Sequence, residues 1–137
     1  MTKLWSISKD IEGNFQLLAT AADLLLVMEY LKEGKSLRNM RDEVKRGVAL
    51  LEIVEKGARS QMDPQLHSED IIMSVVLGIE EELNLRPTQL ADAASKTRKE
   101  IEEGRISAEG WSLIEAIAKV TMRNISREVD ALSSLLR

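Results

Sequence analysis

Glycine and serine residues punctuate this chain where helices are expected to end and begin. Three glycines each follow a run of apolar residues spaced three or four apart, and three serines precede the next such runs: Gly34, Gly57 and Gly104, then Ser36, Ser68 and Ser107. Glycine suits the position just after a helix, and a serine hydroxyl can accept a hydrogen bond from a free amide of the first turn. No segment between these points has the pattern of a paired strand. The punctuation therefore predicts an all-α protein.

The composition fits one small helical domain. The 137 residues are 44% hydrophobic and 31% charged, as is usual for a folded helical protein. A chain of this length buries about 70% of the surface that its unfolded form exposes, so it needs no metal or disulfide to fold. The absence of cysteine excludes disulfides, thiolate catalysis and cysteine-ligated zinc. We expect a single domain over residues 1–137, with no cofactor.

The first predicted helix starts at Ser8 or Asp10 and ends at Glu33. Two neighbouring apolar stripes run along it. The first is expected to face inward and the second to lie on an adjacent face: Ile11, Phe15, Leu18, Ala22 and Leu25, then Leu17, Ala21, Leu24, Met28 and Leu31. A helix that is apolar nearly all round is normally buried on most sides.

The same helix contains the most apolar segment of the chain, residues 15–31. It is short for a membrane span and is interrupted by Asp23 and Glu29, which favours a soluble helix. A secretory signal has an apolar stretch followed by a small-residue cleavage pattern, and the N-terminus has neither. We therefore expect a cytoplasmic protein that does not enter a membrane.

Two further helices are predicted in the middle of the chain. One is capped by Ser36, ends at Gly57 and carries a single apolar stripe: Leu37, Met40, Val44, Val48, Leu51 and Val54. The next is capped by Ser68 and is apolar on every side up to Ile79. Gly78 within it indicates close approach of another helix, since glycine costs about 1 kcal/mol relative to alanine inside a helix.

The last two predicted helices have clear start signals. One begins at Arg86-Pro87, ends at Gly104 and carries a thin stripe: Leu90, Ala94, Thr97 and Ile101. The other is capped by Ser107, with Ile106 placed to pack on Trp111 as a hydrophobic staple. Its long apolar face is expected to reach the C-terminus: Leu113, Ile117, Val120, Val129, Leu132 and Leu136.

Residues able to support catalysis are few. His67 is the single histidine and alone makes neither a metal site nor a triad. The acidic run Glu80, Glu81 and Glu82 could bind magnesium, but consecutive residues spread over about 200° of a helix surface instead of converging. A solvated helix end is the favoured interpretation.

Asp23 lies in an otherwise apolar stretch, where an unpaired buried charge would be costly. One interpretation places it on the solvent-facing line of the first helix. The other is a buried ion pair with an arginine of the second helix that fixes the register of the two. We favour the first.

Basic residues suggest nucleic acid in two places. One is a face of the second helix formed by Arg38, Arg41, Lys45 and Arg46. The other brackets the fourth helix: Arg86, Lys96, Arg98, Lys99 and Arg105. Acids accompany both groups, aromatics are scarce and the net charge is −4, so solvated faces with ion pairing between turns account for most of the pattern.

The stretch from Gln89-Leu90-Ala91 through Ile101 and Gly104 to the segment 113–118 resembles the helix-turn-helix of phage-repressor-type regulators. The resemblance implies a recognition helix for the DNA major groove. The chain departs from that pattern between Ala94 and Ser95. There the family has a glycine-containing turn, and the spacing here is about three residues too short to set the recognition helix at its angle.

The sequence as a whole predicts a compact bundle of four or five helices. Its apolar faces exceed what one small bundle covers, which favours a homodimer. The leading functional hypothesis is a non-catalytic protein-interaction or scaffold subunit that associates with itself or with another protein. The alternatives are a nucleic-acid-binding accessory protein that uses Arg38, Arg41, Lys45 and Arg46, and a magnesium-dependent nucleotide hydrolase at Glu80–Glu82.

Overall fold

The computed structural model describes residues 2–62 and 70–137, and every regular element in these two ranges is helical. The elements, in order, are α1 (Thr2–Lys32), the 3-10 turn η1 (Arg38–Met40), α2 (Arg41–Ser60), α3 (Asp70–Leu83), α4 (Pro87–Glu102) and α5 (Ala108–Leu136). The predicted all-α class is confirmed. Two residues singled out in the sequence, Ser68 and His67, lie outside the described ranges.

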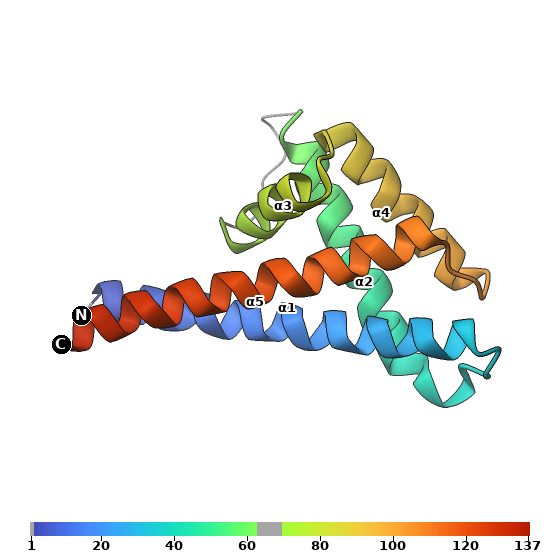
Figure 1. The fold of residues 1–137 in the computed structure, drawn as a ribbon, viewed down its shortest axis with the longest axis horizontal. Coiled ribbons are helices and arrows are strands. Elements are labelled where there is room, and N and C mark those ends of the chain that lie inside the picture. Colours follow the sequence, from blue (N-terminus) through green and yellow to red (C-terminus); the bar gives the residue numbers. More distant parts are fainter. Residues whose placement is uncertain (1, 63–69) are drawn as a thin grey trace.

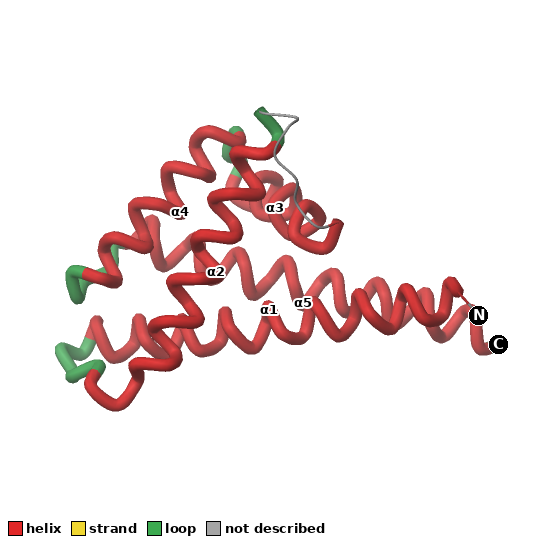
Figure 2. The backbone as a smooth tube through the Cα atoms, turned by 180° about the vertical axis from the view of Figure 1, so that it is seen from behind, coloured by secondary structure: helices red, strands yellow, loops and turns green. Residues whose placement is uncertain are grey.

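The two longest helices, α1 and α5, lie side by side and run in opposite directions (Figure 1). Helix α2 crosses α1, and seen from behind it passes in front of this pair (Figure 2). Helix α4 packs on α2 and α5, and α3 packs on α5 and α2. Both chain ends lie together at one end of the α1–α5 pair, beyond α3 (Figures 1 and 2). One side of the pair is thus covered by α2, α3 and α4.

Two glycines allow the covering helices to approach this pair closely. A Cβ on Gly47 of α2 would lie 2.2 Å from a methyl carbon of Leu24 in α1, and one on Gly78 of α3 would lie 2.5 Å from a methyl carbon of Val120 in α5. Leu24 and Val120 are both buried, so neither side chain can move aside freely. The close approach predicted at Gly78 is confirmed.

The predicted ends of the later helices are confirmed in atomic detail. The Ser107 hydroxyl accepts a hydrogen bond from the Gly110 amide at 3.1 Å and caps α5. Pro87 occupies the first turn of α4. Gly104 and Gly34 have φ angles of 78° and 71°, the left-handed conformation that glycine reaches at low cost after a helix.

Three predicted boundaries are wrong. Helix α1 begins at Thr2 and not at Ser8 or Asp10, because its first turns continue alongside the end of α5. Helix α2 runs through Gly57 to Ser60. Gly57 is buried within the helix and does not end it. Ser36 accepts a hydrogen bond from the Arg38 amide and therefore caps η1, while α2 begins at Arg41.

The predicted core stripes of α2 and α4 are confirmed, but that of α1 is not. In α1 the stripe that faces the rest of the protein is the second one, which we call the inner stripe: Leu17, Ala21, Leu24, Met28 and Leu31. Phe15 is 53% exposed and Ala22 is exposed. The reason is that α2 and α5 pack on only one side of α1, and the two stripes point in different directions.

The predicted apolar face of α5 is buried in the first half of the helix and exposed in the second half. Leu113, Ile117 and Val120 are buried as predicted, whereas Val129 is exposed and Leu136 is 71% exposed. The second half of α5 extends beyond the helices that would cover it (Figure 1). The predicted long core face therefore ends near Asn124.

Candidate functional site

The most distinctive surface of the described protein is an apolar face shared by α1 and α5. We call it the outer face and define it by eight residues of α1 and five of α5: Leu4, Ile7, Ile11, Phe15, Leu18, Ala22, Leu25 and Leu26, then Met122, Ile125, Val129, Leu132 and Leu136. Every member is exposed or only half-buried. The most exposed large side chains among them include Phe15 and Met122, the latter at 59%.

The spacing of the outer face is that of a helix-packing seam. On α1, five members follow one another at steps of four and three residues: Ile11, Phe15, Leu18, Ala22 and Leu25. On α5, the five members alternate between steps of three and four. Alternation of this kind keeps one side of a helix turned toward a partner helix over several turns. Each stripe is therefore built to be covered by another helix.

The two stripes lie on the same side of the α1–α5 pair. The Lys32 amine lies 5.6 Å from the centre of the Trp111 ring. Lys32 continues the line of Leu25 and Leu18 at seven-residue steps, and Trp111 continues the line of Ile125 in the same way. Since the two helices are antiparallel, these lines run beside each other along the pair. The outer face is thus one surface, and its thirteen members include no charged residue.

The opposite, inner side of the pair turns polar at the end that holds the termini. Asn14 and Asn124 are 1% and 4% exposed, and Asn124 Nδ2 donates to Asn14 Oδ1 at 3.5 Å and to Ser74 Oγ at 3.4 Å. Asn14 Nδ2 donates to the Asp10 carbonyl, and Arg127 donates to Asn124 Oδ1. Toward the termini the inner side of α5 continues through Arg127 and Glu128 to the exposed Leu135, while the outer face stays free of charge.

Glu128 belongs to this polar side. Its Oε2 atom is buried and has no hydrogen-bond partner. Burial raises the pKa of the Glu128 carboxyl above its usual 4.5, and the nearby Asp10 raises it further, while Arg127 opposes the shift. A buried acceptor without a donor lowers the stability of the folded state, so this carboxylate destabilises the α1–α5 pair.

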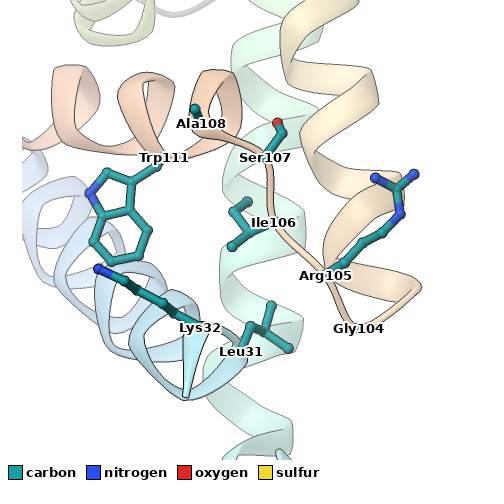
Figure 3. A pocket seen from close by; sticks show the side chains of 8 residues that line it. All are labelled: Leu31, Lys32, Gly104, Arg105, Ile106, Ser107, Ala108 and Trp111. Carbon is teal, nitrogen blue, oxygen red and sulfur yellow. The ribbon is translucent and has the colours of Figure 1, made fainter. Parts of the chain in front are cut away.

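A hollow of about 540 Å³ lies where α1 ends and α5 begins. It is lined by side chains of the α1 end, the α4–α5 loop and Trp111 (Figure 3). Its polar groups are already engaged. Glu100, 1% exposed, accepts from the Ser107 hydroxyl at 2.8 Å and from the Ser107 amide at 3.2 Å, and Arg105 pairs with Glu100 and Glu103. These contacts explain how the loop is held and how α5 is positioned. They leave Lys32, over the Trp111 ring, as the cation at the rim.

The predicted nucleic-acid face is exposed but not uniformly basic. Arg38 lies in η1, and Arg41, Lys45 and Arg46 lie in the first turns of α2, all at the surface. Arg46 pairs with Asp23 at 3.2 Å and lies 3.9 Å from Glu43. Asp42 and Glu43 occupy the same helical turn. Acidic neighbours therefore offset part of this basic cluster.

The second basic group is also largely paired. Arg98 binds Glu52 and Glu55 of α2, at 3.1 Å and 3.4 Å, and Arg105 is held by its glutamates. Helix α4 runs without a break from Pro87 to Glu102. The turn that a repressor-type helix-turn-helix requires between Ala94 and Ser95 is therefore not present.

The acidic run of α3 is drawn into pairs on different sides. Glu82 binds Arg123 at 3.0 Å and lies 4.0 Å from Lys119 of α5, while Glu80 accepts a hydrogen bond from Gln61, the residue that follows α2. In residues 2–62 and 70–137, no group of three histidine or carboxylate side chains is arranged to hold a metal ion. Nothing in this region gathers Glu80, Glu81 and Glu82 around one point.

Asp23 combines features of both interpretations. It is paired with an arginine of α2, as in the second interpretation, but its side chain is 33% exposed, as in the first. The pair lies at the edge of the contact between α1 and α2, where water screens it. It is not a buried ion pair.

Helix α1 is also long and apolar enough, over Lys3–Lys32, to cross a membrane by the criteria of length and composition alone. Core helices of water-soluble proteins pass the same criteria. In the described structure 28% of the relevant window is buried, and the inner stripe accounts for most of that burial.

Two asparagines in the sequence mark the side of each helix that lies opposite the outer face. Asn14 continues the line of the inner stripe, and Asn124 continues the buried line of α5. Two side-chain amides at the same height on neighbouring helices can form a hydrogen bond with each other. They therefore mark the side of each helix that faces the other. No protein-family model matches the chain, and neither curated proteins nor solved structures give a significant match.

Proposed function

We propose that this protein is a non-catalytic interaction subunit whose outer face docks onto a helical protein surface. The observation that carries the proposal is the uncharged, heptad-spaced apolar face of α1 and α5. At 1.5 Å per residue its α1 stripe is roughly 33 Å long and its α5 stripe roughly 21 Å, and each helix is about 10 Å wide. The resulting area, on the order of 500 Å², is in the upper part of the range of about 300–600 Å² for the largest apolar patch of a typical monomer, and patches of that size are often functional.

The margins of the face favour protein over an anionic membrane. The charged residues that flank it on α1 are of both signs and include Glu12, Glu29 and Lys32, and the chain carries a net charge of −4. Helices that bind anionic lipid surfaces place lysines and arginines along their polar face. A helical protein partner needs only an apolar surface complementary to the outer face, because the interior of a protein–protein interface is depleted of charged residues.

The test is the size of the protein in an extract of its native cells. We expect it to sediment as a species larger than the 15.4 kDa chain. The double variant Phe15→Arg, Met122→Arg should sediment as the single chain, because two desolvated guanidinium groups cannot enter an apolar seam. The control variant Leu77→Arg places the same charge at a half-exposed leucine of α3, off the outer face, and should behave as wild type. A wild-type protein that sediments as a single chain in the extract would contradict the proposal.

A further inference from the structure

Resting on the proposed function, we infer that the partner of the outer face is a second copy of this chain. The two α1–α5 pairs would stack face to face about a two-fold axis parallel to the helices. Each α1 would then lie over the α5 of the other copy and antiparallel to it. The product is a four-helix bundle with the α2–α4 layers on its two outer sides.

The first support is the area of the outer face. A standard stable interface buries about 800 Å² on each partner, and in homodimers about 65% of it is apolar. The outer face supplies an apolar area on the order of 500 Å² in one continuous patch, which is what such an interface requires. A second copy covers that patch because it brings a face of the same shape. A two-fold interface uses the same patch on both chains.

The second support is the register that the structure itself fixes. A two-fold axis along the helices preserves height, so residues that share a height within one chain meet across the interface. The short side chains of Asn14 and Asn124 are hydrogen-bonded, which places these two residues level. Each step forward along α1 then corresponds to a step backward along α5, so Phe15 lies within one residue of the height of Met122.

The long-range contact at the other end of the pair agrees with this register. Side chains on a helix point back toward its N-terminus, so those of Lys32 and Trp111 point toward each other along the antiparallel pair. They meet, with the Lys32 amine 5.6 Å from the ring centre, although in this register their backbones differ in height by roughly 7.5 Å.

The outer-face residues interdigitate in this register. Phe15 of one chain lies over Met122 of the other, and Ile7 comes within one residue of the height of Leu132. Two α1 members, seven residues apart, fall between successive α5 members of the other chain: Leu4 and Ile11. Side chains that enter the spaces between those of the facing helix are the arrangement of a packed helical seam.

The third support is the polar inner side near the termini. Asn14, Asn124 and Glu128 make that side of the pair unsuited to an apolar partner. The outer face is therefore the longest apolar side there, with Trp5 and Leu135 exposed outside it, and its exposed members run on to Leu136. In the stacked arrangement these residues become the core of the four-helix bundle.

The first experiment measures the mass of the purified protein by light scattering during gel filtration, over a range of concentrations. We expect twice the 15.4 kDa chain mass for wild type and for Leu77→Arg, and the single-chain mass for Phe15→Arg and for Met122→Arg. Circular dichroism should show unchanged helix content for all four proteins, since both substituted positions on the face are exposed. A purified wild type that stays a single chain, while extracts contain a larger species, would overturn the inference and leave the proposed function intact. A single chain in both settings would sink both.

The second experiment tests the register by disulfide formation, which is clean because the chain has no cysteine. A tagged Phe15→Cys protein is mixed with an untagged Met122→Cys protein under mild oxidation. We expect the mixed cross-linked dimer to dominate, and the matched mixture of Leu77→Cys with Met122→Cys to give no mixed dimer. If cross-links between two Phe15→Cys chains dominate instead, the proposed axis is overturned, because they require α1 to lie on α1.

The third experiment separates protein from lipid as the occupant of the face. Vesicles of neutral and of anionic lipid are added to the purified wild type, and the fraction of protein bound to the vesicles is measured by flotation. We expect the protein to stay in solution at twice the chain mass. Capture by the vesicles in place of dimer formation would identify the occupant as a membrane and overturn the inference.

Discussion

Helix α1 carries two apolar stripes that are nearly indistinguishable in sequence but differ completely in environment. Leu24, in the inner stripe, is fully buried against Gly47 of α2. Phe15, in the outer face, is 53% exposed. Both stripes alternate three- and four-residue steps and both consist of leucine, alanine and other apolar residues. The spacing of apolar residues thus shows that a side of a helix will be covered, but not whether its own chain covers it.

Truncating one residue from each stripe should give the largest contrast. Leu24→Ala is expected to lower the free energy of unfolding by about 3 kcal/mol, since it leaves a cavity in a fully packed region. Phe15→Ala should change it by no more than about 0.5 kcal/mol in dilute protein, as exposed substitutions do. Urea denaturation at low concentration measures both. Equal losses would mean that the two stripes are covered alike within one chain.

The same pair of variants responds differently to concentration. If a second copy covers the outer face, unfolding of wild type becomes harder as protein concentration rises, because association stabilises the folded state. Phe15→Ala should weaken that dependence, whereas Leu24→Ala should keep it. A dependence lost in both variants would tie the association to overall stability and not to the outer face.

The difference between the stripes also explains what the sequence could predict. Helix class, the Ser107 cap and the ends at Gly34 and Gly104 depend on local backbone chemistry, and all are confirmed. The choice of inward stripe in α1 depends on where α2 and α5 pack, which is a property of the whole fold. The prediction therefore selected the stripe containing Phe15 in place of the one containing Leu24. The predicted helix end at Gly57 is wrong for the same reason, because only the whole fold shows that this glycine is buried inside α2.

The functional residues were harder to predict than the helices. The basic positions Arg38, Arg41, Lys45 and Arg46 stand out in the sequence, but pairing partners such as Asp23 are distant along the chain and become neighbours only on folding. The outer face was predicted as excess apolar surface without its location. Two buried asparagines, Asn14 and Asn124, would have located it, since they identify the inner side of both helices.

A medium effect is expected where the inner side turns polar. Glu128→Gln should raise the free energy of unfolding at pH 7, since it removes a charge from a site where burial and Asp10 raise the carboxyl pKa. The sign follows from linkage. Because the pKa of Glu128 is raised in the folded state, the folded wild type binds this proton more tightly than the unfolded chain does. The contribution of the protonated carboxyl to stability is therefore fully present below pH 4.5 and is lost as the pH rises through the folded-state pKa.

Urea denaturation of both proteins at pH 4 and pH 7 checks this. The advantage of Glu128→Gln should vanish at pH 4, where the wild-type carboxyl is largely protonated in both states. The control Glu12→Gln changes an exposed acid near the same chain ends and should show no such pH dependence. An advantage that persists at pH 4 would point to packing, and not charge, as the cause.

The smallest effect should come from the edge between the two sides of α1. Asp23 pairs with Arg46 at 3.2 Å, with side chains 33% and 53% exposed, and half-exposed pairs of this kind contribute about 0.5 kcal/mol or less. A double-mutant cycle with Asp23→Ala and Arg46→Ala isolates the coupling from the contact that Arg46 makes toward Glu43. The coupling should shrink further at 1 M salt, where the Debye length falls to about 3 Å. A coupling of several kcal/mol would instead make the pair a device that fixes the register of α1 on α2. The inner stripe would then owe its burial to one ion pair as much as to the close fit of Leu24 on Gly47.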